Sequence, residues 1–348
     1  FASAGVGWIR GGLGLTNVAG SMLFAGISGT AVAEAASIGA VMIPGMKKEG
    51  YPIEFAAAIT AAASTVGPII PPSVPMIIVG ALTGVSVGRM FMAGAIPGIL
   101  LGLSMMLVCY LLAVKNNYPR RPWKGWRELW DSFLGAFWAL MLTALIVGGL
   151  LSGVVTPAET ALLACVYAFI VGVYFYKGIT LRQVPKIIID SAITSAALLA
   201  LVGIANVFGW IMAAEQIPQT IAKAMLSITN DRMMIILLIN ILLLIVGMFM
   251  ETIAALIILF PTLMAVATGV GIDPVHFATF AVLNLMIGLT TPPVGVCLFV
   301  CANIAKEPLW PVIKAIFPFL IGNLIVLLMV SYIPQLSLWL PNLLFGVR

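Results

Sequence analysis

Long apolar runs separated by short polar or basic stretches make up most of the chain. A helix needs about 20 apolar residues to cross a bilayer, and runs near this length cover residues 92–114, 132–154, 160–176, 187–212 and 309–333. These runs lack the short alternating segments of an outer-membrane barrel. Because only helices and closed barrels satisfy the backbone inside lipid, the pattern predicts an all-α integral membrane protein.

Two segments, 11–48 and 233–268, each consist of two shorter apolar arms around a tip of small or polar residues. The first tip is Ser-Gly-Thr at residues 28–30, and the second covers residues 247–252. The arms of the first segment have about 17 residues, which is the lower limit for a complete crossing. We therefore expect two re-entrant helical hairpins.

Two further apolar helices, 53–86 and 274–304, are interrupted by the same Gly-x-x-x-Pro-Pro sequence, at residues 67–72 and 288–293. Proline has no backbone N–H and collides with the preceding turn, so each helix must open there. The freed carbonyls are costly at membrane depth unless they face protein, water or a cation. A plain proline kink is the alternative for one break alone, but two breaks beside two hairpin tips favour binding sites.

Three landmarks recur in the same order in the two halves of the chain, which predicts an internal repeat. They are Glu34 with Pro44 and Glu251 with Pro261, each pair ten residues apart, then PIEFA at 52–56 and PVHFA at 274–278, then the two Gly-x-x-x-Pro-Pro breaks. The first hairpin ends at Lys47 and Lys48, on the side of the basic loop 115–127, whereas the second opens from the opposite side. The repeats are therefore expected to be inverted, which suits alternating access because one fold can expose the same site to either face.

This organisation divides the chain into four parts. The expected parts are a first transport repeat at 1–91 (hairpin 11–48, broken helix 53–86), scaffold helices with a cytoplasmic amphipathic connector at 92–212, a second transport repeat at 213–305 (hairpin 233–268, broken helix 274–304), and a final scaffold span with its tail at 306–348. Residues 213–232 are more polar and amphipathic than their surroundings.

The composition supports a membrane protein, because 62% of residues are hydrophobic and 8% are charged, against about 25% charged in soluble domains. The net charge of +5 does not indicate nucleic-acid binding, since Lys and Arg cluster in loops. Residues 115–131 hold five basic residues and three tryptophans, as expected of a cytoplasmic connector at the membrane interface. The four cysteines lie in apolar runs, where small buried thiols are common.

Each tip and its facing break can supply carbonyl and hydroxyl oxygens with little charge. This ligand set suits Na⁺, whereas a divalent ion usually recruits more carboxylates. The predicted first cation site consists of Ser28, Gly29, Thr30, Gly67, Ile70 and Ser73. The predicted second cation site consists of Gly247, Met248, Thr252, Gly288, Thr291 and Pro292. Sodium is the only metal expected, as a coupling ion, and no other cofactor is expected.

The helices that resume near Ser73 and Val294 direct partial positive charge into the breaks and can hold a carboxylate without a buried arginine. The substrate-binding candidates are Ser28, Ser73, Asn284, Thr290 and Arg10. For Asn284 the alternative is a helix–helix hydrogen bond, and for Arg10 and Arg89 it is snorkelling to the interface. Glu34 and Glu251 either couple an ion or support the hairpin backbone, and His276 is interpreted as structural.

Four stretches resemble one known family, the large membrane subunit of tripartite ATP-independent periplasmic (TRAP) transporters. They are SMLFAGISGTAVAEAASIGAVMIP at 21–44, GPIIPPSVPMIIVGAL at 67–82, TPAE at 156–159 and GLTTPPVGVCLFV at 288–300. The resemblance covers residues 5–335. Family members carry about two more spans before this point, so the resemblance implies an N-terminally incomplete chain.

The resemblance implies a permease of the bacterial or archaeal inner membrane that works as an elevator, with hairpins and broken helices moving as one body. The implied partners are a small membrane subunit, a periplasmic substrate-binding protein, membrane lipids and an organic acid such as a C4-dicarboxylate or sialic acid, with no nucleic acid. Uptake in the family is driven by Na⁺. The family's two sodium sites fall here on residues 28–30 with 67–73, and on 247–252 with 288–292.

Three other functions are weighed against this one. An ion-coupled organic-anion transporter that works without a binding protein would share the same motifs. A channel would need a continuous polar pore or a ring of like charge, and the sequence shows neither. A membrane enzyme would need a nucleophile with a base, or metal ligands, at depth; one His and no His/Cys/Asp cluster argue against it.

Overall fold

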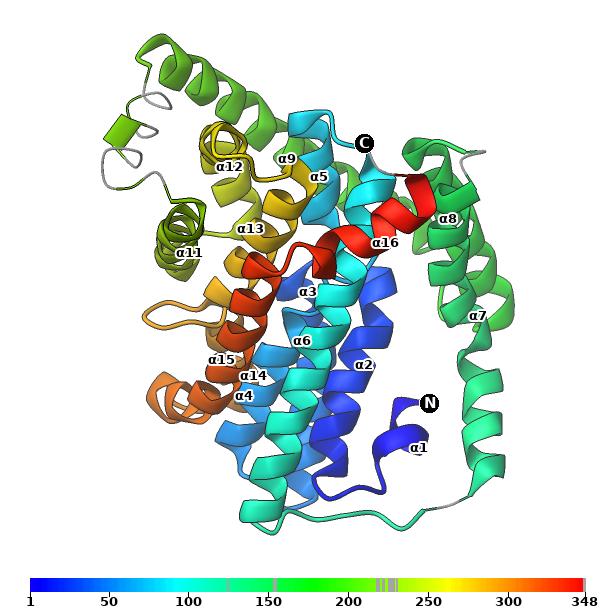
Figure 1. Ribbon diagram of the computed structural model, residues 1–348. Helices are drawn as coiled ribbons and strands as arrows, with labels where there is room; N and C mark the ends of the chain where they lie inside the picture. Colours follow the sequence, from blue (N-terminus) through cyan, green and yellow to red (C-terminus); the bar gives the residue numbers. More distant parts are fainter. Residues whose placement is uncertain are drawn as a thin grey trace.

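The protein is helical in the computed structural model (Figure 1), which describes residues 1–123, 125–152, 155–216, 220, 223–224, 229 and 231–346. The helices of the first half are α1 (Ala2–Val6), α2 (Gly12–Ser28), α3 (Ala31–Lys48), α4 (Ile53–Ser64), α5 (Val74–Thr83), α6 (Val87–Lys115), α7 (Trp126–Ser152) and α8 (Pro157–Ile170), which continues as a π-helix (Val171–Phe175). Those of the second half are α9 (Val184–Ala214), α11 (Arg232–Phe249), α12 (Thr252–Gly269), α13 (Pro274–Gly288), α14 (Val296–Ala305), α15 (Leu309–Tyr332) and α16 (Gln335–Phe345). No strand occurs among these described residues.

Six of the described helices are long and apolar enough to cross a membrane. They are α6, α7, α8 with its π-helical extension, α11, α12 and α15. The hairpin arm α2 and the four halves of the broken helices are shorter apolar helices. The prediction of an all-α, multi-pass membrane protein is confirmed.

The first halves of the two broken helices form the centre of the molecule. Every residue from Phe55 to Ser64 in α4 is buried, and so is every residue from Val275 to Gly288 in α13. Most buried positions of α4 are alanines, and small side chains let membrane helices approach closely. The first break is mostly buried, whereas Pro293 and Val294 of the second break are exposed.

The two hairpins flank this centre, and each begins and ends close to the predicted residues. The pair α2–α3 packs on α4, and the pair α11–α12 packs on α13. Between α2 and α3, Gly29 has a φ of 61°, a left-handed conformation that glycine adopts without a Cβ clash. The second tip is shorter than predicted: α11 continues through Phe249, so Met250 and Glu251 alone separate it from α12.

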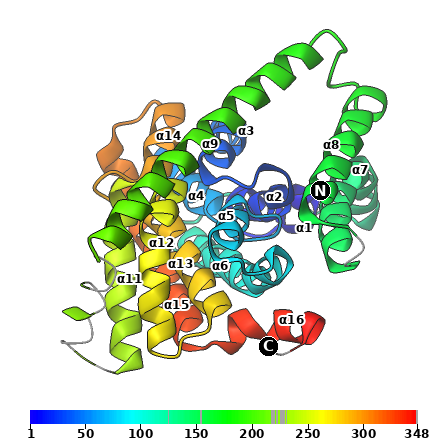
Figure 2. The same ribbon diagram turned by 90° about the horizontal axis from the view of Figure 1, so that it is seen from above.

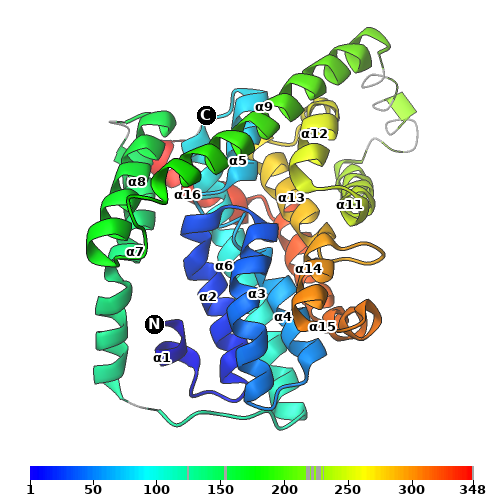
Figure 3. The same ribbon diagram turned by 180° about the vertical axis from the view of Figure 1, so that it is seen from behind.

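Helices α6 and α15 pack directly on the hairpins and broken helices. A Cβ at Gly98 of α6 would collide with the Ile70 side chain, and one at Gly322 of α15 would lie 2.7 Å from the Ser104 hydroxyl of α6. By contrast, Figures 2 and 3 show α7 and α8 at one edge of the molecule, with α9 crossing from there towards α12. The division into scaffold and transport parts stays a prediction.

Two predicted segments differ from the structure, and a third stays a prediction. Residues 126–131 belong to α7, so the non-helical connector ends at Gly125, whose φ is 93°, and not at residue 131 as predicted. The tail after residue 334 forms a further helix, α16. Half of the predicted amphipathic segment 213–232 falls outside the described residues, and its amphipathic character stays a prediction.

The loop after α6 is bound to the base of the first hairpin. The Tyr51 hydroxyl donates to the Pro119 carbonyl over 3.1 Å, and the Gly11 N–H donates to the same carbonyl over 3.2 Å. Arg121 forms a bidentate ion pair with Glu49, whose carboxylate holds the pKa of the guanidinium above its ordinary value. Burial raises the pKa of Tyr51 to about 12.

Candidate functional site

A cavity of about 330 Å³ lies where the two hairpin tips and the two helix breaks meet. The first repeat contributes Gly29, Thr30, Ala31 and Val32 from the tip, and Pro68 and Pro75 from the break and the helix after it. The second repeat contributes Glu251 and Ile253 from the tip, and Met286, Leu289 and Val296 from the broken helix. Four segments that are far apart in the sequence therefore surround one space.

The first tip lies against the first break, as the sequence predicted. A Cβ at Gly29 would be 3.0 Å from the Val74 side chain and 3.5 Å from the Pro72 carbonyl oxygen. Thr30 is half-buried, has extended backbone and occupies the N-cap position of α3. Ser28 ends α2, and its side chain lies outside the described residues.

The first break covers residues 65–73, and its backbone turns are closed locally. The N–H groups of Ile69 and Ile70 both donate to the Val66 carbonyl, over 3.0 and 3.1 Å. The Ser73 hydroxyl donates to the Pro68 carbonyl and accepts the Met76 N–H over 3.2 Å. Ser73 is therefore the N-cap of α5, and its hydroxyl already has two partners.

Gly67 lies against the carboxylate of Glu34. A Cβ at this position would overlap a carboxylate oxygen of that residue. Glu34 is fully buried in the first turn of α3. The glycine of the first motif is thus needed for close contact between the break and the hairpin.

The second break covers residues 289–295 and is closed differently. The Thr290 and Thr291 hydroxyls both donate to the Ile287 carbonyl, over 2.9 and 2.8 Å. The Cys297 N–H reaches back across the break to the Leu289 carbonyl over 3.0 Å. Helix α14 begins at Val296, after Gly295 with a φ of 55°, and so two residues later than the predicted start near Val294. In each break, the peptide bond between the paired prolines, Pro292 and Pro293 here, is cis.

The second tip lies against the second break through two glycines. A Cβ at Gly288 would be 2.6 Å from both the Cα and the carbonyl carbon of Gly247. The predicted site residues Gly247 and Met248 have helical backbone in the last turn of α11, where helix carbonyls have no intrahelical partner, so their role as cation ligands stays a prediction. The polar groups of this tip are Glu251, which lines the cavity, and the buried hydroxyl of Thr252, for which the structure gives no hydrogen-bond partner.

Glu34 and Glu251 do not occupy equivalent positions, contrary to the prediction. Glu251 is the N-cap of α12 and accepts the N–H groups of Ile253 and Ala254 over 2.8 and 3.2 Å. Glu34 lies in the first turn of its helix, after the N-cap Thr30. Their equal spacing from Pro44 and Pro261 is therefore a weaker repeat signal than the paired breaks.

Two predicted substrate-binding candidates lie elsewhere. Arg10 precedes α2 at the base of the first hairpin, where it donates to Asn117 over 3.1 Å. The length of α2 separates it from the tip, so the structure does not bring Arg10 to the cavity. Asn284 is fully buried and donates to the backbone carbonyl and the side-chain oxygen of Asn240, each over 2.8 Å. This contact is the helix–helix hydrogen bond that we gave as the alternative to substrate binding by Asn284.

Several lining residues carry no direct signal in the sequence, because Met286, Leu289 and Val296 are ordinary apolar residues. Their position becomes apparent only once the breaks bring them beside the tips. Arg89, considered as a second anion ligand, instead binds α16, donating to Asn342 over 2.6 Å and to the Gly346 carbonyl over 2.8 Å.

The cavity combines a largely apolar wall with few polar groups, of which the Glu251 carboxylate is the charged one among its lining residues. The N-terminus of α5 lies beside the cavity, because Pro75, in the first turn after the N-cap Ser73, is one of the lining residues. Such a space can hold a small organic ligand, while cations or helix N-termini balance a negative charge. The described residues contain no group of three His, Cys, Asp or Glu side chains arranged to bind a metal ion.

The chain is similar to known transporter proteins over nearly all its length. Residues 1–336 match the family described as "Tripartite ATP-independent periplasmic transporter, DctM component". The sialic acid TRAP transporter large permease protein SiaM of Vibrio cholerae is 41% identical over 346 residues, which cover 99% of this chain and 81% of SiaM. The C4-dicarboxylate TRAP transporter large permease protein DctM of Pseudomonas aeruginosa is 42% identical over 342 residues, which cover 98% and 80%.

A third relative has a longer chain. The isethionate TRAP transporter permease protein DctMQ of Oleidesulfovibrio alaskensis is 40% identical over 342 residues, which cover 96% of this chain and 53% of DctMQ. All three are transporter permeases, so the expectations of a transporter instead of an enzyme, and of a multi-pass inner-membrane location, are confirmed. The chain belongs to the DctM family, the large permease component of the tripartite ATP-independent periplasmic transporters.

Proposed function

We propose that this chain is the large permease subunit of a Na⁺-coupled secondary transporter that imports an organic acid. The observation that supports this most strongly is the cavity lined by both hairpin tips and both helix breaks. A substrate held there touches the two repeats at once. Ions bound at either tip–break contact would therefore change how tightly it is held.

Two sodium ions are proposed, one at each contact between a tip and its break. Backbone carbonyls and threonine hydroxyls are the oxygens available, with Thr30 at the first contact and Thr252, Thr290 and Thr291 at the second. Each threonine hydroxyl of the second break donates its hydrogen to Ile287 and keeps lone pairs for a cation. A monovalent ion suits this low-charge set.

The substrate proposed is a small carboxylate. Relatives named for sialic acid and for C4-dicarboxylates share about two fifths of their residues with this chain. The cavity of about 330 Å³ lies at the lower end of the usual volume of ligand pockets, about 300–1,000 Å³. A carboxylate would be stabilised by the α5 N-terminus and by the bound cations, since no Arg or Lys is among the lining residues.

An elevator motion with inverted repeats is the proposed mechanism. The packing supports it: α5, the second half of the first broken helix, packs on α12, the second arm of the second hairpin. Correspondingly, α14 packs on α3. This reciprocal contact is expected of two inverted copies that move as one body, since each copy then closes the cavity on one side.

The proposed partners are a small membrane subunit, a periplasmic substrate-binding protein and membrane lipids. The word "tripartite" in the family description supports the first two. The binding protein would deliver the substrate and set much of the specificity. A transporter that uses the same sites without a binding protein is the alternative.

The test is uptake by the complete complex in proteoliposomes, with a panel of organic acids supplied with and without the binding protein and with and without a Na⁺ gradient. The proposal predicts saturable uptake of one carboxylate that needs both the gradient and the binding protein. Conductance without saturable uptake would indicate a channel and overturn the proposal. Uptake independent of the binding protein would favour the alternative transporter.

A further inference from the structure

Five buried polar residues form a hydrogen-bonded chain through the second half of the molecule, in which Ser331 takes part through both its hydroxyl and its backbone carbonyl. They lie on α13, α11, α15 and α16, and each is at most 4% exposed: Asn284, Asn240, Ser331, His276 and Ser337. The first of them lies one helical turn before Gly288, where α13 ends at the second break. The last lies on α16, the final helix of the chain.

The part of the hydrogen-bonded chain nearest the break joins three helices. Asn284 of α13 donates to the Asn240 side chain of α11 over 2.8 Å, and Asn240 donates to the Ser331 hydroxyl of α15 over 3.1 Å. Asn240 also donates to the Ile236 carbonyl of its own helix over 3.0 Å. Both amide hydrogens of Asn240 are therefore used, and its side-chain oxygen accepts from Asn284.

The other half joins α13 and α15 to α16. The His276 Nε2 atom lies 3.0 Å from the Ser331 carbonyl oxygen, which can only accept, so we assign the ring hydrogen to Nε2. The His276 Nδ1 atom lies 2.7 Å from the Ser337 hydroxyl. The lone histidine of the chain thus connects the broken helix to two other helices through its two nitrogens.

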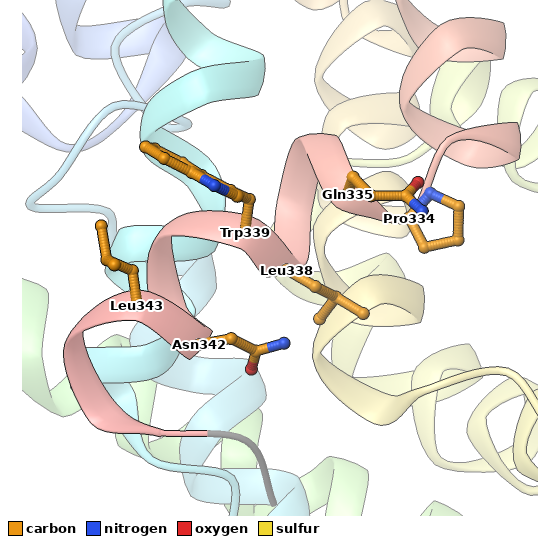
Figure 4. Close-up of a pocket in the computed structure, with 6 residues that line it drawn as sticks. All are labelled: Pro334, Gln335, Leu338, Trp339, Asn342 and Leu343. Carbon is orange, nitrogen blue, oxygen red and sulfur yellow. The ribbon is translucent and has the colours of Figure 1, made fainter.

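Helix α16 is fixed at its other end as well. Arg89, near the start of α6, donates to the Asn342 side chain and to the Gly346 carbonyl. Figure 4 shows Leu338 and Asn342 on one side of α16, and Trp339 and Leu343 on the other. A surface cavity of about 440 Å³ follows the helix between these contacts. Helix α16 therefore runs from α13 to α6 and binds both.

These contacts are difficult to give up inside a membrane. A polar group that loses its partner in an apolar interior finds little water to replace it, so a connected polar chain favours one arrangement of its helices. The hydrogen-bonded chain joins the hairpin arm α11, the broken helix α13 and α15. Helix α16, which binds both α13 and α6, extends this connection to α6. Movement of α13 away from α11 near the break would separate Asn284 from Asn240.

We propose that α16 and this polar chain position the second helix break, with Asn240, His276 and Ser337 acting as positioning residues that contact no ion or substrate themselves. The role in ion binding rests on the proposed second cation site, because the break that the chain positions is one half of that site. The positioning itself does not depend on sodium and is measured separately.

The native Cys297 is a reporter for opening of the second break. It is fully buried in the first turn of α14, and its N–H closes the break by donating to the Leu289 carbonyl. The rate of its alkylation by N-ethylmaleimide is measured in the full complex after the other three cysteines, Cys109, Cys165 and Cys301, are replaced by alanine. A faster rate reports a more populated open break.

The test compares Asn240→Ala, in the part of the hydrogen-bonded chain nearest the break, and Ser337→Ala, at its far end, with the matched control Thr279→Val. Thr279 is also fully buried in α13, but its hydroxyl donates only to the Val275 carbonyl of the same helix. We expect each of the first two variants to speed alkylation about 3- to 10-fold, from the usual strength of hydrogen bonds between membrane helices. Thr279→Val should leave the rate unchanged, and Ser337→Thr should restore it.

The Na⁺ concentration for half-maximal uptake is measured in the same variants and should rise by a similar factor. An alkylation rate that is unchanged in both Asn240→Ala and Ser337→Ala would overturn the inference, and Ser337→Ala on the final helix keeps the test valid if Asn240→Ala does not fold. Faster alkylation together with Na⁺-independent uptake by the wild type would support positioning while the proposed sodium coupling fails. Na⁺-dependent uptake by the wild type, together with unchanged alkylation rates in the variants, would support sodium coupling while the positioning role fails.

Discussion

The contact between Gly247 and Gly288 offers a direct test of the second tip–break pair. A methyl group added by Gly288→Ala would have its carbon 2.6 Å from two backbone atoms of Gly247, whereas ordinary van der Waals contact begins at 3.4 Å. Backbone atoms cannot rotate away as the end of a side chain can. The hairpin arm α11 and the broken helix α13 must therefore move apart by roughly the missing 0.8 Å.

The free-energy cost of Gly288→Ala can be estimated from the usual cost of overpacking. Forcing an extra methyl group into a packed interior costs about 1–3 kcal/mol. Alanine suits the helical backbone of α13 better than glycine by up to about 1 kcal/mol, so the loss does not come from helix propensity. If the strain acts mainly on the ion-bound arrangement, the Na⁺ concentration for half-maximal uptake should rise about 5- to 100-fold, since about 1.4 kcal/mol corresponds to a factor of ten.

The assay is Na⁺-dependent uptake by the reconstituted complex, together with thermal stabilisation of the detergent-solubilised complex by Na⁺. Gly247→Ala should have a smaller effect, because its Cβ would lie 3.1 Å from the nearest atom. Gly45→Ala is the matched control, since a Cβ at this helical glycine of the first hairpin meets nothing within 4 Å. An intact Gly288→Ala complex with wild-type Na⁺ half-saturation would refute the argument that this contact shapes an ion site.

Three further outcomes are expected. Gly67→Ala should raise the Na⁺ requirement less than Gly288→Ala, because its methyl group meets the end of the Glu34 side chain and not backbone; an effect at least as large as that of Gly288→Ala, in the same uptake assay, would contradict this. Thr30→Ala or Thr291→Ala should weaken the Na⁺ dependence of uptake, and unchanged activation in both variants would remove these residues from the sites. Arg121→Gln, which removes a partly exposed ion pair at the hairpin base, should cost less than about 1 kcal/mol, seen as a shift of a few degrees at most in thermal unfolding; loss of the folded complex would show that this pair is structural.

The sequence predicted the hairpins and breaks well because their signals are local. Paired prolines must open a helix wherever they occur, so the breaks followed directly from residues 71–72 and 292–293. Each hairpin was recognisable from two short apolar arms, and the observed helices α2 and α3 differ from the predicted arms by at most a few residues. The local chemistry of proline and the length of apolar runs suffice for such features.

The sequence predicted less well whatever depends on how helices face one another. Helical continuity through Gly247 and Met248 follows from their packing on α13, which the small-residue pattern alone did not reveal. Arg10 was predicted to bind substrate because it is close to the first hairpin in sequence. Closeness in sequence does not show whether a residue lies at the tip or at the base of a hairpin, and Arg10 lies at the base. The partnership of Asn284 with Asn240 joins residues 44 positions apart, and no local pattern indicates it.

Coupling to Na⁺ is the property on which the proposed function of the tips and breaks depends most. The most direct measurement is the initial rate of organic-acid uptake by the complete complex in proteoliposomes, as a function of external Na⁺ with all other ions held constant. If two ions bind beside one substrate, uptake should be absent without Na⁺ and should rise more steeply than linearly as Na⁺ is added. Uptake of the same rate at zero and saturating Na⁺ would contradict this coupling.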